Sequence, residues 1–181
     1  MLRRNLYFAP KSVKTKAYIS CVLPILEYAS NSWHPTSDSS DNALEMVQHN
    51  AARFISNTYS KKGDFKKVSI TKILTNLQME TLQERRIKAR LSMAYKILNG
   101  HVILEANLLP KSRIKPTHRK CNDANVGIDN ELIEPTARLQ CTEKTFFYSI
   151  QKIRNQRVTP SQVAAPSVDA FKAHFKRHPI Q

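Results

Sequence analysis

Most of the side chains in this sequence that could do chemistry are cations. The 181 residues include 29 Lys and Arg against 14 Asp and Glu, which gives a formal net charge of +15. Such a surface favours a polyanionic partner, because surface lysine and arginine side chains neutralise phosphates and release the counterions bound to them. We therefore expect sequence-indifferent contact with nucleic acid, with RNA and DNA both left open.

The candidate nucleic-acid-binding cations fall into three groups. The first, which also includes Lys16, precedes Glu27, the first acid of the chain. The second lies on an expected helix, where Arg86 and Arg90 share one face; Arg53 and Arg86 could equally be buried partners of Glu27 or Glu45. The third lies in an expected linker. The candidates are Arg3, Arg4, Lys11, Lys14, Arg85, Arg86, Lys88, Arg90, Lys111, Arg113, Lys115, Arg119 and Lys120.

Residues that could hold a metal or act as nucleophiles are few. His118 and Cys121 have a ligand-like spacing, but no fourth Cys or His nearby completes a tetrahedral set with Cys141. His174 and His178 are four residues apart without a third ligand, so we interpret them as part of a basic surface. We expect no metal site, no cofactor, no catalytic residue and no small-molecule substrate.

The sequence also bears on the compartment. Its three cysteines are scattered, and no N-terminal apolar segment resembles a signal peptide. No stretch approaches the roughly 20 apolar residues of a membrane-spanning helix. We expect an intracellular protein, nuclear or cytoplasmic, that is neither secreted nor bound to membranes.

The elements that must position the cations are expected to be helices. Few glycines, many good helix formers and apolar residues spaced by three or four predict a mainly α protein. Helices are expected from Ser12 to Tyr28, with a kink or an end at Pro24, and from about 38 to 55, 69 to 77 and 81 to 98. The last has a capping-box spacing at its start and Gly100 as its C-cap.

We expect three regions along the chain. Residues 1–100 form a small helical bundle, and residues 101–140 form a basic linker punctuated by prolines. Residues 141–181 form a C-terminal tail. In the tail, Thr145 to Asn155 reads as a helix or a strand-turn, and Ser167 is placed to cap a terminal amphipathic helix that carries Phe171 and Phe175.

Several short stretches, in order, resemble one family. They are LRRNL at 2–6, LPILEYAS at 23–30 with Trp33 and Pro35, AARFI at 51–55, YKILNG at 95–100 and APSVDAFK at 165–172. Together they resemble the region after the palm in jockey-like non-LTR (LINE-type) retrotransposon reverse transcriptases. The resemblance is thin from His101 to Gln140. Near Ile153 to Pro160 the family's Trp-Asn and Leu-Pro pairs are absent from this sequence.

The resemblance implies a thumb-like helical bundle that contacts template-primer nucleic acid, and it names the upstream palm of the parent polymerase as a possible partner. The parent is an RNA-directed DNA polymerase, whose palm holds two metal ions with paired aspartates. No two aspartates are adjacent here, so we expect a fragment that is not an enzyme. The alternative from another class is a host-retained interaction module, whose Phe171 and Phe175 helix docks a protein partner.

Overall fold

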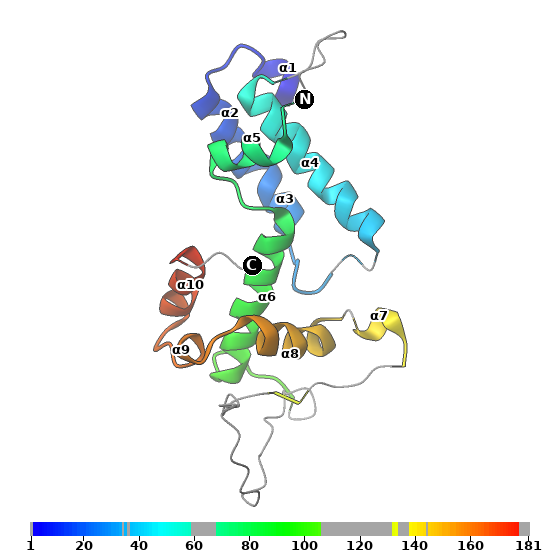
Figure 1. Cartoon of the computed structure of the whole chain (residues 1–181), viewed down its shortest axis with the longest axis vertical. Coiled ribbons are helices and arrows are strands. Elements are labelled where there is room, and N and C mark those ends of the chain that lie inside the picture. Colours follow the sequence, from blue (N-terminus) through cyan, green and yellow to red (C-terminus); the bar gives the residue numbers. More distant parts are fainter. Residues whose placement is uncertain are drawn as a thin grey trace, which may run out of the picture. The chain divides into compact units, whose positions relative to one another are not determined.

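The computed structural model of the chain is mainly helical, which confirms the expected fold class (Figure 1). It describes residues 2–33, 35, 37–58, 68–105, 132–133, 138–143 and 145–177; of residues 140, 141, 160, 161, 176 and 177 it describes only the backbone. The elements are α1 (Leu2–Asn5), α2 (Lys11–Ala17), the π-helix η1 (Tyr18–Val22), α3 (Leu23–Glu27), α4 (Asp38–Ser56), α5 (Ile70–Leu77), α6 (Leu82–Leu98), α7 (Gln140–Glu143), α8 (Phe146–Arg157), α9 (Pro160–Val163) and α10 (Val168–Arg177).

The chain divides into two units, and the division falls inside α6. Unit 1 comprises Met1–Ser30 and Pro35–Arg86, and unit 2 comprises Asn31–His34 and Ile87–Gln181. The sequence placed the boundary after Gly100 instead. The difference has a packing reason, because the apolar residues in the second half of α6 form one core with residues of the tail.

Unit 1 has a core built around α4. One cluster joins η1, α3, α4 and the start of α6, and a second joins α4 to α5. Their buried members are Tyr18, Leu23, Ile55 and Leu82 in the first cluster, and Ala52, Ile73 and Leu74 in the second. In Figure 1, α1, α2 and α5 lie around the end of α4 at which the chain leaves that helix. The helical periods expected over 38–55 and 69–77 are confirmed.

The expected irregularity at Pro24 takes the form of a π turn. Proline has no amide hydrogen, and its ring collides with the carbonyl four residues earlier in an α-helix. Here the amide of Leu23 donates to the carbonyl of Tyr18, five residues back, which widens the turn just before Pro24. The helical path therefore passes Pro24 and ends at Glu27.

The helix ends follow local sequence signals. The Oγ of Ser37 accepts from the Ser40 amide at the start of α4, and the Oγ1 of Thr81 accepts from the Glu84 amide at 3.2 Å, as the capping-box spacing predicts. At the end of α6, Gly100 has φ +70, and the amides of Gly100 and His101 donate to carbonyls of the last turn. This pattern is a Schellman motif, so the predicted C-cap is confirmed.

Unit 2 places the tail on the second half of α6. Its core combines Leu91, Ala94 and Tyr95 of α6 with Ile150, Val158, Ala165, Phe171 and Phe175. The Tyr95 ring stacks on Phe171 with centroids 4.6 Å apart, and the Tyr95 hydroxyl donates to the Ala165 carbonyl at 2.6 Å. Ile153 packs partly buried against this core. Thr145 to Asn155 is helical, and Ser167 caps α10 as expected.

Candidate nucleic-acid interface

The N-terminal cations form an exposed group on α1 and α2, which we call the basic edge: Arg3, Arg4, Lys11 and Lys16. The side chains of all four are exposed, as phosphate contact requires. Arg4, Lys11 and Lys16 make no ion pair with a described residue. The sequence named three of these cations as candidates, and the structure brings all four to one part of unit 1.

Lys14 lies on α2, between Lys11 and Lys16, but its side chain faces inward. This burial counts against the expectation that Lys14 contacts phosphate. Its side chain is 2% exposed. The ammonium donates to Oδ1 of Asn57 at 2.7 Å and lies 4.7 Å from the centroid of the Phe54 ring. Both partners belong to the end of α4, where the negative end of the helix dipole also favours a cation. Lys14 therefore fastens α2 to α4.

The fold separates the charges of unit 1 along α4. Asp38, Asp41 and Glu45 occupy its first turns, whereas Lys14 attaches the basic helix α2 at the other end. A helix of 19 residues spans about 28 Å. The Debye length at physiological salt is only about 8 Å, so these acids do little to weaken the field of the basic edge.

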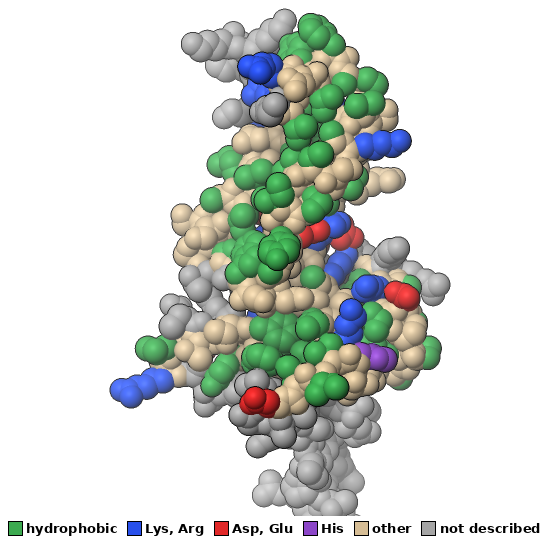
Figure 2. Space-filling model, turned by 180° about the vertical axis from the view of Figure 1, so that it is seen from behind, with side chains coloured by type: hydrophobic (Ala, Val, Ile, Leu, Met, Phe, Trp, Pro, Cys, Tyr) green, Lys and Arg blue, Asp and Glu red, His purple; other side chains and the backbone are tan. Residues whose placement is uncertain are grey.

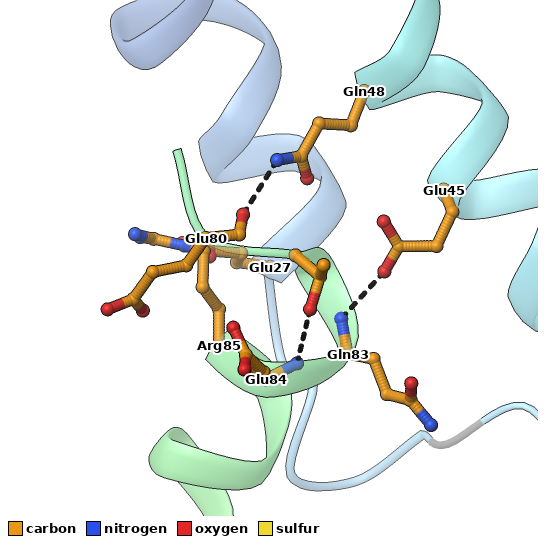
Figure 3. A network of polar contacts seen from close by, with 8 residues as sticks. Glu27, Glu45, Gln48, Glu80, Gln83, Glu84 and Arg85 are labelled. Atoms are coloured by element: carbon orange, nitrogen blue, oxygen red, sulfur yellow. Dashed lines mark hydrogen bonds and ion pairs between the residues drawn. The ribbon is translucent and has the colours of Figure 1, made fainter. Parts of the chain in front are cut away.

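The first two arginines of α6 serve as internal partners. The guanidinium of Arg85 is paired through Nε and Nη2 with the carboxylate of Glu27, and this hydrogen bonding raises the pKa of Arg85 (Figure 3). Arg86 is buried and is paired through Nη2 with Asp41. The sequence allowed Arg86 to be a buried partner of Glu27 or Glu45. Arg86 is indeed buried and paired, but the carboxylate that it contacts belongs to Asp41.

A polar network surrounds the start of α6 in unit 1 (Figure 3). The carboxylate of Glu45 accepts from the backbone amide of Gln83 at 2.8 Å, and the side chain of Gln48 donates to the carbonyl of Glu80 at 2.7 Å. These contacts hold the first turn of α6 against α4. Glu27, Asp41 and Glu45 of unit 1 are therefore used to position the start of α6.

Arg90 is fully buried in unit 2, and a phosphate cannot reach it there. Its Nη2 donates to Oγ of Ser149, and its guanidinium lies 5.5 Å from the centroid of Phe146. The Nε and Nη1 groups have no acceptor among the described residues, and burial lowers the pKa of Arg90 to about 10. Lys88 is half-buried and has a partner of its own. The expectation that the cations of α6 bind phosphate therefore has no support at Arg86 or Arg90.

The linker candidates lie outside the described residues. They are Lys111, Arg113, Lys115, Arg119 and Lys120. The same holds for His118 and Cys121, and the side chains of Cys141 and His178 are not described either. Among the described residues, no group of three or more His, Cys, Asp or Glu side chains could hold a metal ion. No helix within the described part is long and apolar enough to cross a bilayer.

Two features of unit 1 escaped the sequence reasoning. The turn between α1 and α2 exposes Tyr7 and Phe8, and a groove of about 350 Å³ opens between α1, α2, η1 and α4. The groove is lined mainly by apolar side chains, with Arg3 and Lys14 also present. The signal for the aromatic pair was available, because Tyr7 and Phe8 stand between Arg4 and Lys11 in the sequence.

Comparison of the chain with protein-family models, curated proteins and solved structures finds no match.

Proposed function

We propose that this chain binds nucleic acid without sequence preference, through phosphate contacts made by the basic edge. The observation that supports the proposal best is the exposure of Arg3, Arg4, Lys11 and Lys16 on α1 and α2, at the other end of α4 from Asp38, Asp41 and Glu45. Clustered cations on one face are the electrostatic footprint of a phosphate-binding surface. Either RNA or DNA meets this requirement.

We further propose that the chain is a non-catalytic piece related to the thumb of a non-LTR retrotransposon reverse transcriptase. This proposal rests on the short sequence stretches between residues 2 and 100 that resemble the family in the same order, and on the absence of adjacent aspartates. The helical fold is compatible with it, since a thumb needs only a rigid helical surface that carries cations toward a phosphate backbone.

The alternative interaction module loses its proposed anchors. Phe171 and Phe175 are both buried in the core of unit 2, where Phe171 stacks on Tyr95 and packs edge-to-face against Phe175. A helix whose aromatic face is already covered cannot offer that face to a partner. The structure therefore favours the nucleic-acid proposal over this form of the alternative.

A salt titration of duplex DNA binding tests the proposal. The log of the binding constant falls against log salt by about 0.9 for each phosphate contact. Replacing Arg3, Arg4, Lys11 and Lys16 by glutamine should flatten this slope by roughly three units. A matched control replaces Arg138, Lys152, Arg157 and Lys172, which are exposed in unit 2, so the change in net charge is the same. The control should flatten the slope by less than about one unit.

Two results would contradict the proposal. Binding that does not depend on salt would exclude phosphate contact as its source. Equal flattening in both quadruple variants would mean that net charge matters and the basic edge does not. Retained circular dichroism in the variants shows that neither set of substitutions acts by unfolding the chain.

A further inference from the structure

Two exposed aromatic side chains stand on the turn between α1 and α2. Tyr7 is 59% exposed and Phe8 is 96% exposed. Their rings touch edge to face, with centroids 5.0 Å apart and planes at 87°. Because Phe8 keeps nearly all of its surface in solvent, this contact leaves a face of its ring open.

The backbone of this turn is held in place. The amide of Leu6 donates to the carbonyl of Leu2 at 2.9 Å, and the amide of Ala9 donates to the carbonyl of Leu6 at 3.1 Å. Pro10, with φ −65, then leads directly into α2. The aromatic pair is therefore presented by a defined turn, and two side chains of this size are exposed where burial would stabilise them.

The surroundings of the pair are cationic. Arg3 and Arg4 precede it and Lys11 follows it, all exposed, and no acid occurs before Glu27. Exposed aromatic rings between cations match the chemistry of single-stranded nucleic acid, in which bases offer π faces and the backbone offers phosphates. A duplex does not match it as well, because its bases are already stacked on one another.

We propose that Tyr7 and Phe8 form a stacking platform for an unpaired nucleobase, while Arg3, Arg4 and Lys11 bind the neighbouring phosphates. The platform makes the basic edge selective for single strands. This inference rests on the proposed function, because the cations must first bring the strand to the turn. Other parts of unit 1 also expose apolar side chains (upper half of Figure 2), but among the described residues only this turn combines two adjacent exposed aromatic rings with cations before and after them in the sequence.

An abasic strand separates stacking from phosphate contact. The full chain is titrated with oligo(dT) of about ten nucleotides, a length that one binding module covers, and with an abasic strand of the same length and charge. Wild type should bind oligo(dT) more tightly by roughly five- to a hundredfold. Phe8→Ala should remove most of this difference and leave the affinity for the abasic strand unchanged, whereas Phe8→Trp should retain it.

Tyr28→Ala is the matched control, since Tyr28 is an exposed aromatic of unit 1 that lies next to Glu27 in sequence. It should keep the preference for oligo(dT). Equal binding of the two strands by wild type would overturn the platform while leaving the phosphate proposal intact. An equal loss in Tyr28→Ala and Phe8→Ala would also overturn it, because general apolar surface would then be responsible. Loss of both strands in the quadruple variant of the basic edge, with Phe8 present, is expected if the cations recruit the strand.

Discussion

At the scale of single residues, the fold gives neighbouring cations opposite roles. Lys14 and Lys16 are two positions apart on α2, yet Lys14 is buried against Phe54 and Asn57 whereas Lys16 is exposed. A buried ammonium must be partnered, and here an amide oxygen and an aromatic ring serve in place of a carboxylate. Only the exposed lysine is available to phosphate.

This difference predicts opposite effects for the same substitution. Lys14→Met removes the hydrogen bond to Asn57 and should lower the free energy of unfolding by about 1–2 kcal/mol, with no effect on the salt slope of binding. Lys16→Met should change stability by less than about 0.5 kcal/mol and flatten the slope by up to about one unit. Urea unfolding and DNA titration of both variants check this. Equal stability losses would show that Lys14 does not fasten α2 to α4.

The raised pKa of Tyr18 predicts that the stability of the fold depends on pH in the alkaline range. Burial, followed by the charge of Glu27, raises the pKa of Tyr18 from 10 to about 12. Between these values the unfolded chain loses the phenol proton while the folded chain keeps it. The Tyr18 contribution to stability is therefore complete below about pH 10 and is lost as the pH rises toward 12.

Tyr18→Phe tests this directly. An absorbance titration of tyrosinate should contain a component near pH 12 that is missing from the variant. The Tyr18 hydroxyl has no hydrogen-bond partner among the described residues, so the substitution should not destabilise the fold and should raise its stability at neutral pH by up to about 1 kcal/mol. A large loss of stability would reveal a hydrogen bond at this hydroxyl.

At the scale of elements, helix ends carry local strain that can be measured. Gln78, which follows the last residue of α5, has φ 52, and Gly100, just beyond α6, has φ 70. Both residues lie in the left-handed region, which is costly for a residue with a Cβ and free for glycine. Gln78 is exposed, so its side chain contributes no packing that would offset this cost.

Substitutions at these two positions should therefore change the free energy of unfolding in opposite directions. Gln78→Gly should raise the free energy of unfolding by about 0.5–1 kcal/mol, and Gly100→Ala should lower it by about 1 kcal/mol. Apart from the two chain neighbours, no atom of the described residues lies within 4 Å of a Cβ added at Gly100, so the loss reflects backbone conformation instead of a clash. Urea unfolding measures both. Destabilisation by Gln78→Gly would show that the side chain of Gln78 has a stabilising contact.

At the scale of the whole molecule, the charge excess does not imply catalysis. In-line nucleotidyl transfer of the kind a reverse transcriptase performs needs carboxylates that hold two metal ions, and no two aspartates are adjacent in this sequence. The purified chain should therefore incorporate no nucleotide on a template-primer with magnesium or manganese. Incorporation that follows the protein through purification would contradict this, and the same preparation should still retain the template-primer in a binding assay.

Much of the helical framework is determined by the sequence itself. The period of apolar residues over 38–55, the Thr81 to Glu84 spacing and Gly100 placed helices and caps correctly, because these signals act between residues that are close along the chain. The irregularity at Pro24 was expected for the same reason. Its resolution by a π turn was not, because a proline can also kink or end a helix.

Only the tertiary structure decided which cations remain available. Arg86 and Arg90 share a helix face, as their spacing predicts, but that face is buried and its charges are used inside the fold. The same holds for Lys14. Burial and ion pairing depend on residues such as Asp41 and Asn57 that are more than 40 positions away, and no local pattern encodes those distances. Composition thus established the positive charge of the protein, and long-range packing determined which of its cations stay exposed.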